Sequence, residues 1–355
     1  MPEKLPRELA EGACSGALFG ILAEGLSDRF EPALCDAYAR LFAPLFDADP
    51  ARYFRVRGVR RVSADQARVV VLSRITLGAD VAVTSVLLDA AKRRFPRAEI
   101  VFAGPAKNYE LFAGDPRIVH APVDYTRGDW RAVCEKLCAV TADALVIDPD
   151  SRLTQLGLLP VTTEERYCFF ESRSYGAGTK RTLPDLAAEW AAETFGVAGS
   201  KPFLALAPPP ESGDRIAVSL GVGGNQTKRI ADPFEERLLQ LLSKTGLEVW
   251  VDKGAGGEEA ARVERAARGA RLFEGPFAGF ARVIAGSRLY VGYDSAGQHV
   301  AAACGVPAIT VFAGFPSERM FHRWKSAGER STVLRVDHSD PDGVLARVEA
   351  ALRLF

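Results

Sequence analysis

Short apolar segments alternate with amphipathic helical patterns along most of this chain, and this alternation constrains the fold more than any other feature. The first series has apolar runs at residues 69–72, 100–102, 118–120 and 145–147. The second series has runs at residues 216–220, 248–251, 271–273, 289–292, 308–312 and 332–336. Short strands that are apolar on both faces are typical of parallel sheets covered by helices on both sides. The sequence therefore predicts an α/β protein with two doubly wound domains.

The domain boundaries follow from the places where this pattern changes. Residues 1–65 carry apolar side chains at three- and four-residue spacings, so we expect a helical N-terminal extension. The two α/β domains are expected at 66–206 and 214–340, with a terminal helix at 341–355. A proline-rich linker at 207–213 joins the domains. Two domains joined in this way would form a cleft, which is a favoured place for a ligand.

The composition excludes some classes of partner. Lys and Arg number 45 and Asp and Glu number 45, so an attraction of the whole surface to nucleic acid is not expected. The six cysteines are scattered, as is typical of reduced thiols in the cytosol. The chain opens without a signal-peptide pattern, and no stretch approaches the roughly 20 apolar residues of a membrane span. We therefore expect a cytoplasmic protein that is soluble or at most peripheral to a membrane.

An arginine-rich stretch closes the N-terminal extension. Its members are Arg52, Arg55, Arg57, Arg60 and Arg61. They form either an ordinary solvated face or a surface for an anionic acceptor or a membrane, and the sequence leaves both readings open.

Residues 289–312 combine an apolar strand, a turn of small residues and a short Ala-rich helix. Asp294 and Ser295 open the turn, and His299 lies in the first turn of the helix. Ligands of open parallel sheets bind outside the carboxyl ends of the strands, where helix N-termini favour a phosphate. The pattern indicates a site for a phosphorylated sugar or nucleotide. The alternative is a simple helix cap, with His299 as an ordinary surface residue.

Two other strand ends of the second domain carry residues suited to a nucleotide. Glycines at 221, 223 and 224 follow a strand and lead to Thr227 and Lys228, so the backbone could approach a diphosphate that Lys228 neutralises. Glu258 follows the next strand, where it either binds the ribose hydroxyls or only stabilises the start of a helix. A plain turn between strand and helix remains the alternative for the glycine-rich segment.

Carboxylates mark two strand ends of the first domain. Asp80 lies at the start of the helix after the first strand, where it either caps the helix or accepts a proton from a sugar hydroxyl. Asp148-Pro149-Asp150 has the spacing of a metal-binding D-x-D motif. It follows an ordinary buried strand, so we interpret it as a turn.

Four stretches in this order resemble glycosyltransferase family 9, the ADP-heptose:lipopolysaccharide heptosyltransferases. They are residues 74–96, 104–118, 221–228 and 293–312, and Asp294-Ser295 with His299 is similar to the D-S-G-x-x-H signature of that family. The resemblance covers roughly residues 68–340. It implies a GT-B fold of two Rossmann-like domains, with the acceptor held by the first domain and the donor by the second. It also implies an inverting transfer without metal or cofactor, from a nucleotide sugar that is best matched by an ADP-sugar.

The resemblance assigns roles by position. Asp80 would be the catalytic base, and Lys228 would offset charge on the departing diphosphate. Contacts to the donor would come from Gly223, Gly224, Thr227, Glu258, Asp294, Ser295, Ala296, Gly297 and His299. Arg74 and Thr76 would contact the acceptor, a lipopolysaccharide-type or other glycan or glycolipid at the inner face of a membrane.

Two departures from the family pattern are visible. Ala79 precedes the predicted base where the family has glycine, and Ala296 replaces the glycine of D-S-G. We expect these replacements to disturb loop geometry, because glycine reaches conformations that alanine does not. Two other functions therefore stay open: a nucleotide-sugar epimerase or hydrolase on the same scaffold, and a non-catalytic nucleotide-sugar-binding protein.

Overall fold

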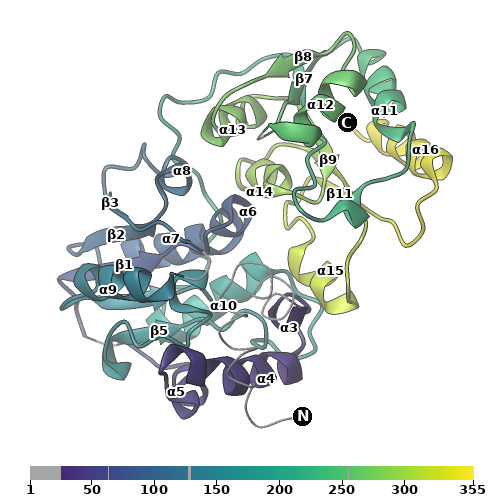
Figure 1. Cartoon of the computed structure of the whole chain (residues 1–355). Helices are drawn as coiled ribbons and strands as arrows, with labels where there is room; N and C mark the ends of the chain where they lie inside the picture. The colour runs from purple at the N-terminus through teal and green to yellow at the C-terminus, as the bar shows by residue number, and fades with distance from the viewer. Residues whose placement is uncertain (1–24, 63, 127–128, 255) are drawn as a thin grey trace. The chain divides into compact units, whose positions relative to one another are not determined.

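The computed structural model describes residues 25–62, 64–126, 129–254 and 256–355, and it divides into two compact units (Figure 1). Unit 1 consists of residues up to Pro202 together with Ser317–Arg323, and unit 2 of Phe203–Pro316 together with Trp324–Phe355. The expected extension therefore belongs to unit 1, and the expected terminal helix to unit 2. The helical pattern predicted for residues 1–24 lies outside the described residues.

Unit 1 is built on a five-stranded parallel sheet with the order β3-β2-β1-β4-β5. The strands are β1 Arg68–Leu72, β2 Glu99–Gly104, β3 Ile118–Pro122, β4 Leu145–Asp148 and β5 Tyr167–Phe169. After β1 the chain forms α6 Leu77–Ala79, a π-helical turn η3 Asp80–Thr84 and α7 Ser85–Arg94. The other helices that follow strands are α8 Ala106–Tyr109, α9 Trp130–Val140 and α10 Leu183–Phe195. Short 3-10 turns η4 Arg152–Thr154 and η5 Glu164–Arg166 lie between β4 and β5.

The N-terminal extension is part of the hydrophobic core of unit 1. Its described helices are α3 Gly25–Ser27, α4 Pro32–Phe42, η2 Ala43–Phe46 and α5 Pro50–Val56. Tyr38 and Phe42 of α4 and Tyr53 of α5 are buried in one cluster with side chains of α9 and of the sheet. The helices α4, α5 and α9 therefore cover one face of this sheet, while α7 packs on β1 and β2 with α10 beside it.

The arginines of the extension attach it to the segment between β4 and β5. Arg52 is buried, donates from Nη1 to the Gly157 carbonyl oxygen at 3.1 Å and lies 4.7 Å from the Tyr167 ring centroid. Arg55 forms an ion pair with Glu164 at 2.7 Å, and Arg60 donates to the Glu164 carbonyl oxygen. These contacts give the stretch a structural role that neither sequence reading anticipated.

Unit 2 is built on a six-stranded parallel sheet with the order β11-β10-β9-β6-β7-β8. The strands are β6 Arg215–Ser219, β7 Glu248–Asp252, β8 Arg271–Phe273, β9 Leu289–Tyr293, β10 Ala308–Phe312 and β11 Ser331–Arg335. The helices are α11 Phe234–Ser243, α12 Gly257–Ala266, α13 Phe277–Ala285, α14 Ala296–Ala303 and α16 Pro341–Leu352, with a 3-10 turn η6 Gln226–Lys228. The helix α15 Glu318–Trp324 lies at the boundary, because all but its last residue belong to unit 1.

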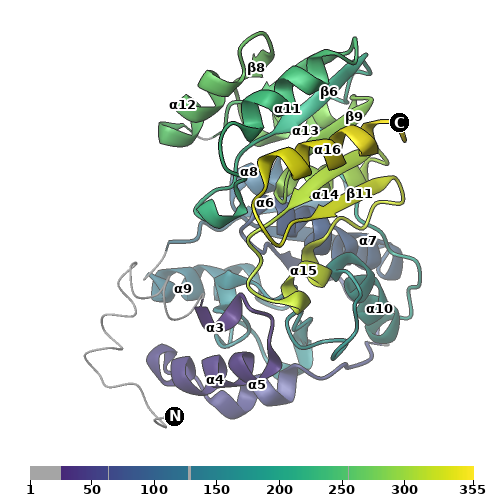
Figure 2. The ribbon, with the colours of Figure 1, turned by 90° about the vertical axis from the view of Figure 1, so that its right-hand side faces the viewer.

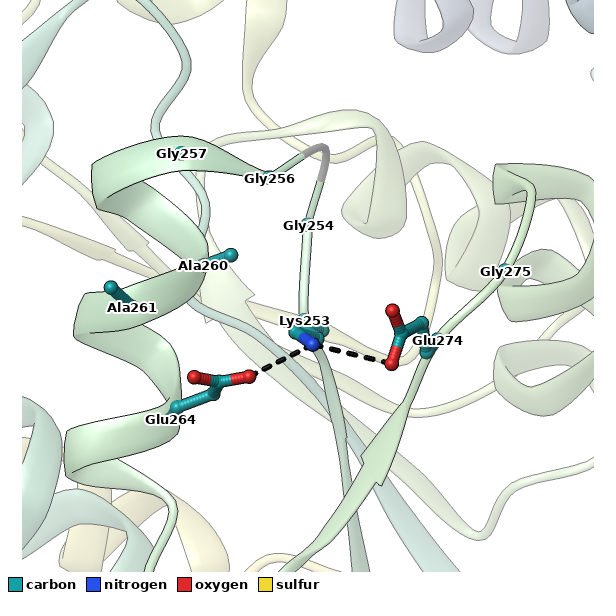
Figure 3. Close-up of a pocket in the computed structure, with 9 residues that line it drawn as sticks. All are labelled: Lys253, Gly254, Gly256, Gly257, Ala260, Ala261, Glu264, Glu274 and Gly275. Atoms are coloured by element: carbon teal, nitrogen blue, oxygen red, sulfur yellow. Dashed lines mark hydrogen bonds and ion pairs between the residues drawn. The ribbon is translucent and has the colours of Figure 1, made fainter.

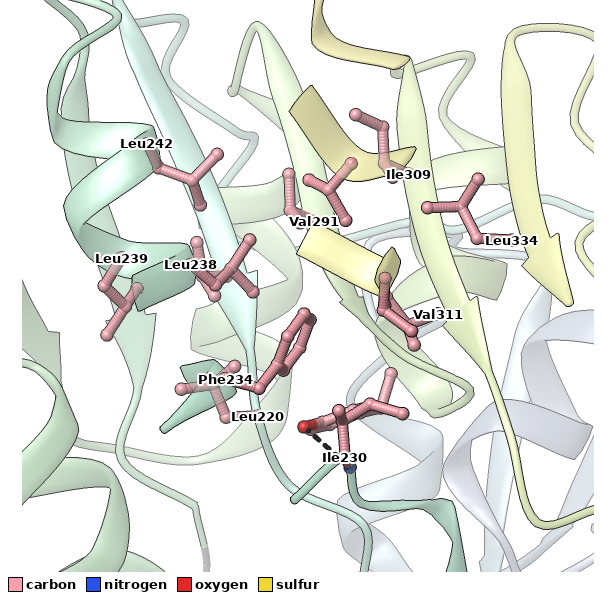
Figure 4. Packing of buried hydrophobic residues seen from close by; sticks show 14 of the residues in the cluster. Leu220, Ile230, Phe234, Leu238, Leu239, Leu242, Val291, Ile309, Val311 and Leu334 are labelled. Carbon is pink, nitrogen blue, oxygen red and sulfur yellow. Dashed lines mark hydrogen bonds between the residues drawn. The ribbon is translucent and has the colours of Figure 1, made fainter. Parts of the chain in front are cut away.

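The core of unit 2 lies between its sheet and the helices α11, α12 and α16. Figure 2 shows α11 and α16 side by side in front of the strands. Phe234, Leu238 and Leu242 of α11 face Val291 and Val311 of the sheet in Figure 4. Both α13 and α14 pack on the strands outside this cluster, so the sheet is covered on both faces. The predicted α/β class with two parallel sheets is confirmed.

Candidate functional site

Each sheet has one place where the strand order reverses. In unit 2 this switch point lies between the neighbours β6 and β9, and in unit 1 between β1 and β4. Ligands of open α/β sheets bind outside the carboxyl ends of the strands at such a point. A ligand is therefore expected at the segments that leave these four strands.

At the switch point of unit 2, Lys228 and Asp294 form an ion pair. Lys228 Nζ lies 2.7 Å from Asp294 Oδ2 and 3.2 Å from the Asp294 carbonyl oxygen. The other carboxylate oxygen, Oδ1, accepts from the Gln298 side-chain amide. The side chain of Lys228 is 18% exposed and that of Asp294 6%. The sequence placed both residues at one site although they are 66 positions apart, and the structure brings them together.

Thr227 stands beside this pair on an exposed loop. Its hydroxyl donates to Asn225 Oδ1 at 2.6 Å, and its backbone N–H donates to the same oxygen at 3.1 Å. A second contact of 3.4 Å reaches the Gly314 carbonyl oxygen in the segment after β10. The loop that carries Thr227 and Lys228 is therefore hydrogen-bonded to the segment that follows β10.

The helix α14 begins at this same edge of the sheet. Ser295 is its N-cap residue with extended backbone, and the Tyr290 hydroxyl lies 3.3 Å from Ser295 Oγ. A side chain at Gly297 would collide with that Tyr290 hydroxyl, so glycine is required there for close packing. Ala296 lies inside the helix and has no positive φ. Free N–H groups in the first turn of α14 can receive an anion.

The expectation that Ala79 and Ala296 disturb loop geometry is wrong. Ala79 has φ −71° and ψ −33°, an ordinary right-handed helical conformation, and Ala296 is helical as well. Alanine adopts this conformation more readily than glycine does. Neither replacement therefore argues for a non-catalytic protein.

His299 is buried in α14, with 5% of its surface exposed. Burial lowers the pKa of its imidazole to about 4, and the nearby Lys228 acts in the same direction against the carboxylate of Asp294. The ring meets the Trp324 ring edge-on at 5.8 Å between centroids. His299 is therefore neutral at pH 7 and can offer one hydrogen-bond donor and one acceptor.

The two glutamates at the start of α12 have different positions. Glu258, the predicted ribose ligand, is exposed beside a cavity of about 430 Å³ that Gln226 and Arg229 also line. Glu259 instead turns inward, and its Oε1 accepts from the backbone N–H of Val222 at 2.7 Å and of Gly223 at 3.2 Å. The sequence did not single out Glu259, because neighbouring glutamates at a helix start look equivalent.

A larger cavity of about 540 Å³ opens where β7 and β8 end. Figure 3 shows Lys253 at its floor between Glu264 of α12 and Glu274 after β8, with ion pairs of 2.8 and 3.2 Å. Gly254, Gly256 and Gly257 form the turn above it. This cavity and the Lys228–Asp294 pair lie at the same carboxyl edge of the unit 2 sheet.

Asp80, the predicted base, is fully buried in unit 1. Its Oδ1 accepts from the Arg74 backbone N–H at 2.7 Å and from Thr84 Oγ1 at 2.6 Å. Its Oδ2 accepts from Ser73 Oγ and from Asn108 Nδ2, both at 2.6 Å. Burial raises the pKa of this carboxyl group, and the four hydrogen bonds lower it in part. The expectation that Asp80 presents a free carboxylate to an acceptor is therefore wrong, because all four of its accepting directions are occupied.

The Asp80 network holds a strained loop at the switch point of unit 1. Ile75 has a φ of 77°, a conformation that β-branched residues rarely adopt. Its N–H donates to Ser73 Oγ at 2.8 Å, and its carbonyl oxygen accepts from Asn108 Nδ2 at 3.0 Å. The same side chains that bind the Asp80 carboxylate thus fix Ile75.

The predicted acceptor contacts, Arg74 and Thr76, flank Ile75. Arg74 is half-buried and donates from Nη1 to the Pro149 carbonyl oxygen at 2.5 Å and to Ser172 Oγ at 2.8 Å. Thr76 is exposed at the N-cap of α6. Only Thr76 of the two therefore presents an exposed side chain at this strand end.

The Asp148-Pro149-Asp150 segment is a turn, as interpreted from the sequence. Asp148 accepts from the Ser151 N–H at 2.6 Å and from the Tyr167 hydroxyl at 2.5 Å, and burial raises its pKa to about 6. Asp150 accepts from Arg173 Nε at 2.9 Å. In the part of the chain that the structure covers, no three His, Cys, Asp or Glu side chains gather in a way that could hold a metal ion.

Comparison with known proteins supports the resemblance seen in the sequence. Residues 226–342 match the family model described as Glycosyltransferase family 9 (heptosyltransferase). No curated protein matches the chain by sequence. Among the described residues, no helix has the length and hydrophobicity needed to cross a membrane.

Several solved structures share the fold. The E. coli heptosyltransferase WaaC with ADP-2-deoxy-2-fluoro heptose is 17% identical with a TM-score of 0.60, over 81% of this chain and 99% of that one. A family 9 glycosyltransferase from Veillonella parvula is 15% identical with a TM-score of 0.60, over 83% and 100%. The E. coli ADP-heptose lps heptosyltransferase II is 18% identical with a TM-score of 0.57, over 81% and 99%. Residues 226–342 therefore resemble glycosyltransferase family 9, and the chain shares the fold of these enzymes.

Proposed function

We propose that this protein is a family 9 glycosyltransferase of the heptosyltransferase type, which transfers a sugar from a nucleoside-diphosphate donor to a hydroxyl group of a glycan acceptor. One observation carries the proposal. At the switch point of unit 2, the Lys228 ammonium lies 2.7 Å from Asp294 Oδ2, directly before the free N–H groups of α14. A cation beside a helix N-terminus is suited to a diphosphate.

The donor diphosphate would lie between Lys228, Thr227 and the first turn of α14. Lys228 carries the positive charge that stabilises the diphosphate as its bond to the anomeric carbon breaks. Asp294 orients the ammonium through the ion pair and can also accept a hydrogen bond from a sugar hydroxyl. His299, neutral at pH 7, lies one helical turn further and completes the polar lining.

The reaction is proposed as a single inverting displacement without a metal ion. The oxygen of the acceptor hydroxyl bonds to the anomeric carbon, and the bond from that carbon to the diphosphate oxygen breaks. The bonding electron pair leaves with the diphosphate, and the hydroxyl proton passes to a water molecule of the solvent. Lys228 and the α14 dipole take the part that a divalent cation has in other transferases. Asp80 contributes by holding residues 73–76 rather than by taking the proton, since its oxygens are already occupied.

An ADP-sugar is the donor we favour, because solved structures with this fold contain ADP and an ADP-heptose analogue. The cavity beside Lys253 would take the nucleoside, since it opens at the same sheet edge as Lys228. The acceptor would be a lipopolysaccharide-type glycan or glycolipid that approaches residues 74–76, with the protein in the cytoplasm or at the inner face of a membrane.

Titration calorimetry with ADP tests the donor site. A Lys228→Met variant should bind ADP about 10- to 100-fold more weakly, because a hydrogen bond to a charged group contributes about 1.5–3 kcal/mol. Lys244→Met is the matched control, since Lys244 is an exposed lysine at the far end of α11. Equal affinity in the wild type and Lys228→Met would contradict the proposal.

A further inference from the structure

Both ends of the glycine-rich loop 221–229 meet at one carboxylate. Glu259 Oε1 accepts from the N–H groups of Val222 and Gly223 at the start of the loop, at 2.7 and 3.2 Å. The same oxygen lies 3.4 Å from Arg229 Nη2 at the end of the loop. The Glu259 side chain is 24% exposed and that of Arg229 9%.

Arg229 is itself held firmly, so the contact fixes the loop rather than a mobile side chain. Its Nη1 forms an ion pair with Glu235, which is buried in α11. Glu235 in turn pairs with Arg262 of α12 at 2.9 Å. The carboxylate of Glu259 and this ionic chain connect the loop to both α11 and α12. Lys228 precedes Arg229 directly, so its backbone is fixed from the same point.

Two successive backbone N–H groups that point at one place form a site for an anion. In this protein that place is filled by Glu259, a group of the chain itself. The N–H groups of Val222 and Gly223 are therefore not open to a donor diphosphate. Gly223 has a φ of 61°, so glycine is favoured at the position whose N–H meets Glu259. Gly224 has open space where a Cβ would stand, and its φ is not positive.

We infer that Glu259 is a positioning residue for the donor site, one that clasps loop 221–229 so that Thr227 and Lys228 stand where the diphosphate binds. The inference rests on the proposed function. It also changes the assignment of the glycine-rich turn: residues 222–224 bind the Glu259 carboxylate, and the diphosphate is left to Thr227, Lys228 and the start of α14.

Hydrogen–deuterium exchange of the full chain without ligand tests the clasp directly. In Glu259→Ala, the amides of Val222 and Gly223 lose their acceptor and should exchange about 10-fold faster. Glu259→Gln keeps an oxygen acceptor and should exchange nearly as the wild type does. Glu329→Ala is the matched control, because Glu329 is an exposed glutamate just before β11, at the edge of the sheet opposite the loop. Unchanged exchange at 222–223 in Glu259→Ala would overturn the inference.

Calorimetry with ADP on the same variants then tests whether the Glu259 contacts with the loop affect the affinity for ADP. Glu259→Ala should weaken ADP binding about 10-fold, while Glu259→Gln and Glu329→Ala should stay within about twofold of the wild type. Gly224→Ala should also leave the affinity unchanged. Tighter ADP binding in Glu259→Ala, or a large loss in Gly224→Ala, would show that the turn itself receives the diphosphate and would overturn the assignment. If the wild type binds no ADP, the proposed function fails while the exchange result still decides on the clasp.

Discussion

Replacing Asp80 with asparagine separates a positioning role from a base role. Each Asp80 oxygen accepts from one hydroxyl and one N–H group: Thr84 and the Arg74 backbone at Oδ1, Ser73 and Asn108 at Oδ2. Asparagine turns one of these oxygens into a donor. A hydroxyl can rotate and become an acceptor, but the N–H group that faces the new amide cannot. At least one hydrogen bond to a charged acceptor is therefore lost in either orientation.

The expected loss of stability follows from these contacts. One hydrogen bond to a charged group contributes about 1.5–3 kcal/mol, and an N–H left without an acceptor costs about 1–3 kcal/mol more. The variant also no longer buries a charge, which offsets part of this cost. We expect a net loss of about 2–3 kcal/mol, which lowers the melting temperature of a unit of this size by roughly 4–12 °C.

Scanning calorimetry and the pH dependence of kcat on the full chain decide between the roles. If Asp80 positions the loop, the melting temperature falls, and Asn108→Ala lowers kcat in the same way, because Asn108 binds both Asp80 and Ile75. The variant then keeps the pH profile of the wild type. A wild-type melting temperature together with a kcat lowered about 10²–10⁴-fold is the signature of a general base and would rule out the positioning role.

Two further predictions concern stability. Burial lowers the pKa of His299 to about 4, so between pH 6.5 and 4 the unfolded chain binds a proton that the folded chain does not. The stability that this neutral imidazole provides is present above pH 6.5 and is lost toward pH 4, by up to about 3 kcal/mol. The difference in melting temperature between wild type and His299→Gln should therefore shrink from pH 7.5 to pH 4.5; parallel curves would contradict this. Arg52→Met should cost about 2–3 kcal/mol, because it removes the hydrogen bond to Gly157 and the contact with the Tyr167 ring. A surface role in acceptor binding would leave the melting temperature unchanged.

Much of the fold could be predicted because the patterns of apolar residues that indicate strands and helices are local in the sequence. The predicted runs at 271–273 and 308–312 coincide with β8 and β10 residue for residue. The meeting of Lys228 and Asp294 was also predictable, since both follow strands whose carboxyl ends share one edge of a parallel sheet. Which domain a helix joins is not a local property. The pattern of α15 gives no sign that Ser317–Arg323 belongs to unit 1.

The roles of single carboxylates were harder to predict, since they depend on distant partners. Asp80 is saturated in part by Asn108, which lies 28 positions away, so its sequence neighbourhood does not reveal its burial. The side chains of Glu258 and Glu259 point in directions that differ by about 100° around the helix axis. Which of them meets Val222 depends on where α12 begins and how it is oriented in the fold. The arginines after Ala51 were interpreted as surface residues, because the carbonyl oxygens that accept their hydrogen bonds lie about 105 positions further along the chain.

The proposed function requires that a nucleoside diphosphate binds unit 2 at Lys228, Asp294 and the start of α14. Hydrogen–deuterium exchange of the whole chain with and without saturating ADP tests it most directly. We expect slower exchange in residues 226–229 and 294–298 when ADP is present, and no such change in Lys228→Met at the same ADP concentration. Protection confined to unit 1, or none in these two segments although calorimetry detects binding, would contradict it.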